Sequence, residues 1–158
     1  MAEYHPIQAR ETPTVDSPPM TAVEFRRLCA VNCLYFVKRL CGVSSTYEDI
    51  RTVLEPGSTG VSMQRLAETA RAYGYGVTPA KLSRREMVKS GSLLIALGVP
   101  DNGPRTVGHF YVVVPIPSRN GYWVFDPPRK RTWVSLDQMK KDDNRRGPTL
   151  SLKPPRFD

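Results

Sequence analysis

The chain has little cysteine and even less histidine, with three Cys and two His among 158 residues. Three thiols cannot all pair within the chain, and their spacing does not indicate the disulfide scaffold of a small secreted protein. Cys29 and Cys33 lie one helical turn apart, which suits neither a Cys-x-x-Cys redox motif nor a zinc knuckle. Because His5 and His109 are the only imidazoles, the sequence predicts no metal site, and it implies no organic cofactor.

Long apolar runs are also missing. No apolar segment approaches the roughly 18–20 residues that a membrane-spanning helix needs. Residues 1–20 are polar and rich in proline, and they lack the apolar core of a signal peptide. We therefore expect a cytoplasmic protein with a flexible tail over residues 1–20. Residues 21–158 are long enough for one domain with its own hydrophobic core.

Acidic residues are fewer than basic ones, so the net charge is +8 and the pI is near 9.7. Such a balance can favour an anionic partner. However, acidic residues interrupt the basic ones near the C-terminus, and no sequence signature of a nucleic-acid-binding fold accompanies them. We interpret the excess as a solvated basic surface and expect no nucleic-acid partner. A basic protein that binds nucleic acid or another anionic surface is kept as a distant alternative.

The apolar pattern divides the chain into helices followed by strands. A spacing of three and four residues predicts a helix within residues 22–41, and capping residues predict two more, over about 47–54 and 62–73. Strands are predicted over 76–81, 93–97, 109–114, 122–125, 132–134 and 149–152, with short helical turns over 84–89 and 135–140. Helices that precede an antiparallel sheet indicate an α+β fold.

Three residues in this pattern carry reactive groups. Cys29 opens the apolar helical run, His109 heads one strand, and Asp126 ends the next strand. A thiol at a helix N-terminus, an imidazole and a carboxylate are the parts of a papain-like nucleophile site. Each residue also has a structural interpretation: a buried inert thiol, a strand histidine satisfied by hydrogen bonds, and a turn aspartate before Pro127. Their order along the chain favours the triad.

Strand geometry predicts how the histidine and the aspartate meet. The segment 115–121 breaks strand character, and a loop centred at 117–118 would place His109 directly opposite Asp126, with Cβ atoms roughly 4.5–5.5 Å apart. The alternative is a tight turn at Asn120–Gly121, which would leave the two side chains far apart. We prefer the first register because the second forces both prolines of this segment into a paired strand.

These segments resemble the bacteriocin-processing, double-glycine-leader cysteine peptidases, a papain-like family. Residues 29–34 read Cys-Ala-Val-Asn-Cys-Leu, similar to the family's Cys-Gly-x-Ala-Cys-Leu. Residues 108–110 read Gly-His-Phe before a run of valines, and residues 126–127 read Asp-Pro, as in the family's other two motifs. A helical segment over 60–74 is similar as well. The resemblance covers roughly residues 22–152.

The resemblance implies a papain-like fold, with N-terminal helices packed on an antiparallel sheet, and a thiol peptidase. Cys29 would be the nucleophile, His109 the general base and acid, and Asp126 the residue that orients the imidazole. It also implies a peptide substrate, such as a precursor cut after a Gly-Gly leader, and an export transporter as a possible partner in a bacterial cell.

One position differs from the family's pattern. The family has a Gln six residues before the nucleophile that helps to form the oxyanion hole, and this chain has Val23 there. Valine cannot donate a hydrogen bond, so a second hypothesis is a weak or inactive domain of the same fold. Such a module would hold a peptide without cleaving it.

Overall fold

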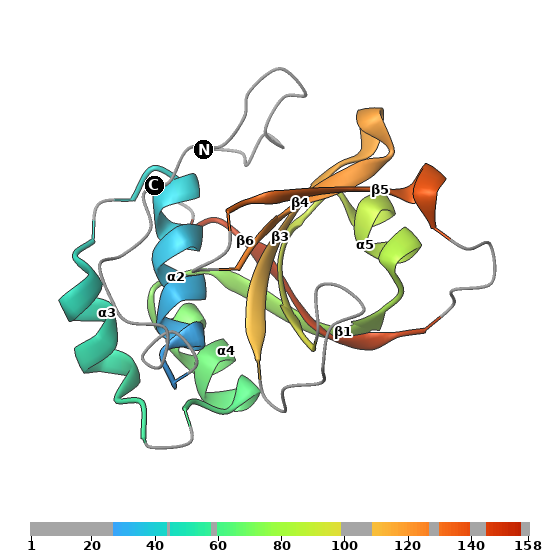
Figure 1. Ribbon diagram of the computed structural model, residues 1–158. Helices are drawn as coiled ribbons and strands as arrows, with labels where there is room; N and C mark the ends of the chain where they lie inside the picture. Colours follow the sequence, from blue (N-terminus) through green and yellow to red (C-terminus); the bar gives the residue numbers. More distant parts are fainter. Residues whose placement is uncertain are drawn as a thin grey trace.

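Three helices cover one face of an antiparallel sheet and a shorter helix covers the other (Figure 1), in a computed structural model of the chain. The structure describes residues 27–43, 45–57, 60–98, 109–126, 130–139 and 145–155. The predicted tail over residues 1–20 lies outside these ranges. None of the helices in the described ranges is long and apolar enough to cross a membrane.

The helices on the first face are α2 (Cys29–Leu40), α3 (Tyr47–Leu54) and α4 (Met63–Ala72). Local signals set their ends. The Thr46 hydroxyl accepts a hydrogen bond from the Asp49 amide at the start of α3, and the Ser62 hydroxyl accepts one from the Arg65 amide at the start of α4. Gly42 follows α2 with a positive φ of 75°. The sequence indicates Ser62 and Gly42 at these positions, and it leaves Ser45 and Thr46 as alternatives for the cap of α3.

The sheet has six strands, which are antiparallel to their neighbours, in the order β1-β6-β2-β3-β4-β5. Their bounds are β1 Gly76–Leu82, β2 Leu93–Leu97, β3 Phe110–Ile116, β4 Gly121–Phe125, β5 Thr132–Ser135 and β6 Gly147–Lys153. Short 3-10 turns, η1 (Pro117–Arg119) and η2 (Leu136–Gln138), follow β3 and β5. All of the predicted strands and helical turns are present, and their bounds differ from the predicted ones by at most two residues.

Alternate residues of the central strand β3 serve two separate cores. Phe110, Val112 and their even-numbered neighbours pack with α2, α3 and α4. Tyr111 and Val113 pack on the other face with helix α5 (Arg84–Ser90). Because both faces are covered, β3 is buried along its whole length. Such complete burial holds the two ends of β3 in fixed positions relative to the helices.

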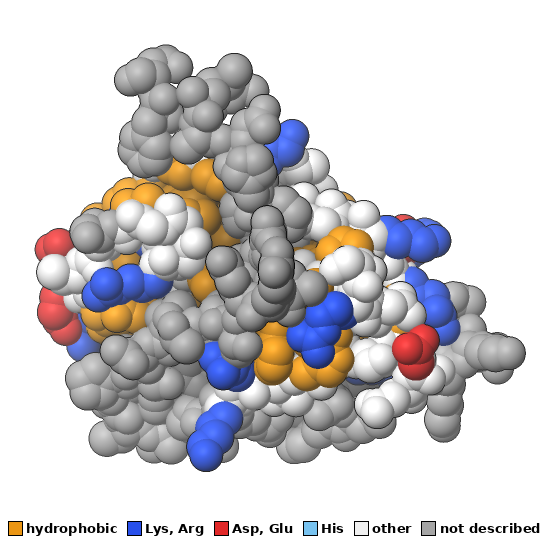
Figure 2. All heavy atoms as spheres, turned by 90° about the horizontal axis from the view of Figure 1, so that it is seen from above, with side chains coloured by type: hydrophobic (Ala, Val, Ile, Leu, Met, Phe, Trp, Pro, Cys, Tyr) orange, Lys and Arg blue, Asp and Glu red, His pale blue; other side chains and the backbone are white. Residues whose placement is uncertain are grey.

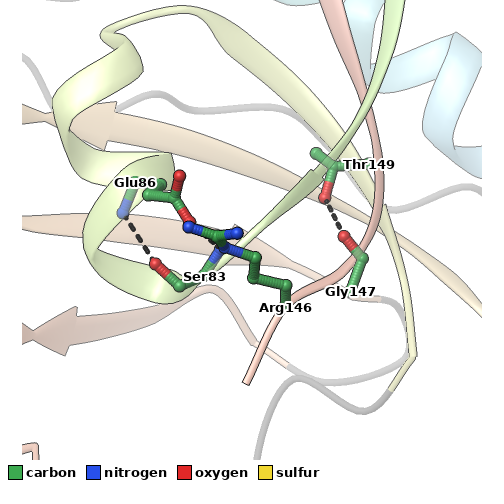
Figure 3. A network of polar contacts seen from close by, with 5 residues as sticks. All are labelled: Ser83, Glu86, Arg146, Gly147 and Thr149. Atoms are coloured by element: carbon green, nitrogen blue, oxygen red, sulfur yellow. Dashed lines mark hydrogen bonds and ion pairs between the residues drawn. The ribbon is translucent and has the colours of Figure 1, made fainter. Parts of the chain in front are cut away.

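A polar cluster fastens α5 to the start of β6 (Figure 3). Ser83 and Glu86 form a reciprocal capping box at the N-terminus of α5, and the Arg146 guanidinium donates a hydrogen bond of 2.8 Å to the Glu86 carboxylate. Beside it, the Thr149 hydroxyl donates to the Gly147 carbonyl over 3.1 Å. These contacts hold α5 over the face of the sheet that lies opposite α2.

The predicted register of the hairpin between β3 and β4 is wrong by one residue at the loop. The pairs Val112–Phe125 and Ile116–Gly121 centre the loop between residues 118 and 119. The predicted loop over 115–121 starts too early, because Pro115 stays in β3, beyond the point where pairing with β2 ends. There the missing N–H of a proline costs no bond to a second neighbour.

The alternative, a tight turn at Asn120–Gly121, is also wrong, because the 3-10 turn η1 forms the loop between β3 and β4. In the observed register, position 126 lies opposite Tyr111 rather than His109. His109 and Asp126 are therefore diagonal neighbours across the two strands, a separation that long side chains can bridge.

Candidate active site

Cys29 is the first residue of α2, as the sequence predicts. The preceding residue, Leu28, makes no capping hydrogen bond with its side chain, and the first turn of α2 carries no acidic residue. The thiol therefore lies at the N-terminal end of α2 without a carboxylate from the helix's own first turn beside it. Cys29 is only 4% exposed, so the thiol lies at the edge of the core rather than on an open surface.

His109 and Asp126 lie just outside the ends of β3 and β4, at the same end of the sheet. The His109 carbonyl accepts a hydrogen bond of 2.9 Å from the Gly98 amide, which extends the β2–β3 ladder by one step and holds the histidine backbone. The imidazole Nε2 lies 2.6 Å from Asp126 Oδ1. Both side chains are largely shielded, with 18% of His109 and 10% of Asp126 exposed.

The imidazole also contacts the thiol. Hydrogen bonds with the side chains of Asp126 and then Cys29 raise the pKa of His109 to about 9, against the opposing effect of burial. Since Nε2 is engaged by Asp126, Nδ1 is the ring nitrogen left for the sulfur. The structure thus brings all three predicted site residues together, with the imidazole between the carboxylate and the thiol.

The other two thiols have different surroundings. Burial, followed by the charges of Cys29 and Asp126, raises the pKa of Cys33 well above its ordinary value. Burial also raises the pKa of Cys41. Cys33 lies one turn further along α2 and has its thiol in the core behind the reactive groups. Because the pKa of both other thiols is raised and Cys29 is the thiol that contacts His109, Cys29 is the candidate nucleophile.

Two contacts that the sequence did not indicate hold α2 in place. The Tyr47 hydroxyl donates a hydrogen bond of 2.6 Å to the buried Asn32 side chain, which joins α3 to α2 one turn beyond Cys29. The rings of Phe36 and Phe125 lie 5.7 Å apart, which joins α2 to the last residue of β4. Both pairs are distant in sequence, so no local pattern could have found them. Together they position the thiol relative to Asp126.

Other predicted motif residues lie outside the described ranges, namely Val23, Gly108 and Pro127. Within those ranges, no group of His, Cys, Asp and Glu side chains is arranged to hold a metal ion. The arrangement that the structure describes is suited to nucleophilic chemistry, because the imidazole can exchange a proton with the sulfur while the carboxylate fixes its orientation.

Comparison with known proteins agrees with this arrangement. The model of the Peptidase C39 family matches residues 20–144. No curated protein matches the chain. A crystal structure of a double glycine motif protease from an AMS/PCAT transporter, in complex with the leader peptide, is similar, with a TM-score of 0.66 and 18% identity over 93% of this chain and 96% of that chain.

Two further solved structures are similar. The peptidase domain of Streptococcus ComA, a bi-functional ABC transporter involved in a quorum sensing pathway, has a TM-score of 0.63 and 19% identity over 81% of this chain and 92% of that chain. The N-terminal peptidase C39-like domain of a toxin secretion ATP-binding protein from Vibrio parahaemolyticus has a TM-score of 0.56 and 14% identity over 79% and 95%. Likeness at these identities shows the fold, and it confirms the predicted papain-like α+β architecture.

Proposed function

The chain belongs to the Peptidase C39 family, and from this premise we propose that it is a cysteine peptidase with Cys29 as nucleophile. His109 is the general base and acid, and Asp126 orients the imidazole. The observation that carries this proposal is the imidazole of His109, which is hydrogen-bonded to Asp126 on one side and to the Cys29 side chain on the other. A histidine with only a structural role in the strand would not need hydrogen bonds to both side chains.

The chemistry follows from these contacts. The Cys29 sulfur attacks the carbonyl carbon of the scissile peptide bond, and the C–S bond forms as the carbonyl oxygen takes up negative charge. The protonated His109 then gives its proton to the departing amine, and the C–N bond breaks. In the second half, His109 takes a proton from water, the resulting hydroxide attacks the thioester, and the sulfur leaves. Backbone N–H groups at the N-terminal end of α2 are suited to stabilise the oxyanion.

For the substrate we propose a peptide or protein cut after a small residue, with a Gly-Gly leader as the first form to test and an export transporter as a possible partner. Support comes from the similar double glycine motif protease, which was crystallised with a leader peptide, and from the similar ComA domain of a transporter.

A second candidate function is a peptide-binding module that cleaves slowly or not at all. The burial of Cys29 favours it, because a residue that is 4% exposed offers little surface to a substrate. Val23 at the position of the family's oxyanion Gln also favours it, since removal of one such donor typically costs about 10²–10³ in turnover.

Single-turnover cleavage of a Gly-Gly-containing peptide distinguishes the two functions. We compare the wild type with Val23→Gln and with Cys29→Ala. We expect slow wild-type cleavage that Cys29→Ala abolishes, and faster cleavage by Val23→Gln. The gain could approach 10²-fold, roughly, although a grafted donor usually recovers less than a native one.

Fast wild-type cleavage that depends on Cys29 would mean that another group supplies the donor. Peptide binding without cleavage, both by the wild type and by Val23→Gln, would favour the binding module.

A further inference from the structure

Cys33 is a buried thiol that the proposed peptidase reaction does not use. It is 2% exposed, and it lies in α2 one helical turn after Cys29, on the same side of the helix. Both cysteines belong to the core that α2 shares with the sheet. The candidate nucleophile therefore has a second sulfur directly behind it.

The spacing of the two thiols is close to that of a disulfide. Residues four apart in a helix have Cβ atoms about 5–6 Å apart, whereas a disulfide needs about 3.5–4.5 Å. Cys29 is the first residue of α2, and the Leu28 side chain makes no capping hydrogen bond there. A helix end moves by 1–2 Å, roughly the shift required, more easily than the middle of a helix. The resulting bond would be strained and therefore easily reduced.

The charges around Cys33 favour a reaction with an oxidised Cys29. After burial, the charge of Cys29 is the next largest cause that raises the pKa of Cys33, so the two sulfurs are within electrostatic reach of each other. A sulfenic acid at Cys29 is neutral, and its formation removes this charge. The Cys33 thiol thus becomes easier to deprotonate when Cys29 is oxidised.

The third thiol is too far away to take part. Cys41 follows the other end of α2, roughly 18 Å from Cys29 along the helix axis. Figure 1 shows the N-terminal end of α2 at the bottom of the molecule, and Figure 2 views the molecule from above, onto the opposite end of this helix. Cys41 is therefore a natural control for the pair at the active site.

We propose that Cys29 and Cys33 form a peroxide-sensitive pair, in which oxidation of Cys29 is followed by a disulfide to Cys33 that small thiols reduce again. The disulfide would inactivate the site reversibly and protect the nucleophile from further oxidation. This inference rests on the proposed function, since it takes Cys29 as the nucleophile, and it adds regulation of the same site.

Hydrogen peroxide is the oxidant in the first step. The Cys29 sulfur attacks one peroxide oxygen, the S–O bond forms and the O–O bond breaks. The departing hydroxide takes up the proton shared by the sulfur and His109, and it leaves as water. In the second step the Cys33 sulfur attacks the Cys29 sulfur, the S–S bond forms and the S–O bond breaks. The hydroxide leaves with the Cys33 proton as a second water. A dithiol later returns the two electrons and restores both thiols.

Mass spectrometry of one tryptic fragment tests the proposal. Trypsin cleaves after Arg27 and Lys38, so Cys29 and Cys33 lie on one fragment, residues 28–38, while Cys41 lies on another. The full chain is treated with a small excess of hydrogen peroxide at pH 7, unfolded in urea, alkylated with iodoacetamide and digested without a reductant. We expect fragment 28–38 to carry no alkyl group and to be lighter by about 2 Da, the mass of two hydrogen atoms. Dithiothreitol before alkylation should restore two alkylated cysteines.

Cys33→Ala removes the second sulfur and keeps an apolar side chain in the core. After peroxide, this variant should gain about 32 Da on Cys29, the two oxygens of a sulfinic acid, and dithiothreitol should not reverse the gain. Cys41→Ala is the matched control and should behave like the wild type. The wild-type measurement itself does not depend on the folding of either variant.

Four results would overturn the proposal: a wild type that forms the sulfinic acid as readily as Cys33→Ala, a disulfide to Cys41, a disulfide between two chains, or two cysteines in fragment 28–38 that stay fully alkylated after peroxide. Cleavage of the Gly-Gly peptide before oxidation separates this proposal from the peptidase. A reversible 28–38 disulfide in a chain that does not cleave would support the pair and remove the peptidase. Cleavage that peroxide abolishes irreversibly in the wild type would do the opposite.

Discussion

Replacing Asp126 with Asn tests whether the candidate triad holds a charged imidazole. The Nε2–Oδ1 contact of 2.6 Å and the Cys29 side chain keep His109 protonated, and its pKa rises from 6.5 to about 9. Asn keeps the shape of the Asp126 side chain but removes its charge. The variant should therefore lose the electrostatic part of the contact with little change in packing.

The size of the loss follows from the pKa of His109. A rise from 6.5 to about 9 corresponds to about 3 kcal/mol of folding free energy. Asp126 is the largest cause of this rise and Cys29 the second. Asp126→Asn should therefore lower the free energy of unfolding by about 2 kcal/mol at pH values at which the imidazole is protonated in both the folded and the unfolded chain. Because the folded-state pKa is the higher one, this stability is fully present below pH 6.5 and is lost as the pH rises through about 9.

Urea unfolding between pH 5.5 and 10 measures this dependence. At pH 6 the midpoint of Asp126→Asn should lie about 1 M below that of the wild type, given a typical urea dependence of about 1–3 kcal/mol/M. Near pH 10 the two midpoints should converge. Glu48→Gln is the control, because Glu48 is an exposed carboxylate in a 3.9 Å surface pair with Arg51, and its removal should leave the midpoint nearly unchanged at every pH.

A second measurement reads the histidine itself. The chain has only two histidines, so NMR of the imidazole protons gives two titrating signals, and His5→Gln assigns them. The reasoning is refuted if His109 titrates near 6.5 in the wild type, or if Asp126→Asn loses the same free energy at pH 6 and pH 10. Either result would mean that the contact with Asp126 is structural and does not charge the imidazole.

Two further predictions concern the thiols and helix α5. At pH 6, iodoacetamide should label Cys29 before Cys33 or Cys41, because burial raises the pKa of the latter two; equal rates by mass spectrometry would contradict this. Ser83→Ala removes the N-cap of α5 and should lower the free energy of unfolding by about 1 kcal/mol. Arg146→Gln should lower the free energy of unfolding by less in the same urea assay, because the Arg146 side chain is 63% exposed. A larger loss for Arg146→Gln than for Ser83→Ala would contradict this prediction.

The helices were predictable because their signals are local. A hydroxyl at the N-cap accepts a hydrogen bond from an amide two or three residues later. Ser62, and the pair Ser45 and Thr46, therefore mark helix starts without any knowledge of the rest of the fold, and the structure has the cap at Thr46. The alternation of apolar residues likewise marks the strands. The order of the six strands did not follow from these patterns, because pairing between β6 and its neighbours β1 and β2 joins segments far apart in sequence.

The site was predicted more accurately than the geometry that forms it. His109 and Asp126 meet, but across a diagonal, because Pro115 is accommodated in β3 and the loop moves one residue along the chain. Proline argues strongly against a strand position that pairs with two neighbouring strands, and only weakly against a position that pairs with one. Sequence alone does not tell which neighbours a residue has, so it could not distinguish the two cases.

Strand β4 ends at the candidate triad and packs against α2. Phe125 packs against α2, and Trp123 faces the same core two residues earlier, whereas Tyr122 and Val124 face the core beneath α5. A one-residue slip of a strand exchanges its two faces. Such a slip of β4 would turn Trp123 toward α5 and would also remove the Phe36–Phe125 contact that positions α2 beside Asp126. The register of this one hairpin therefore determines where the thiol meets its imidazole.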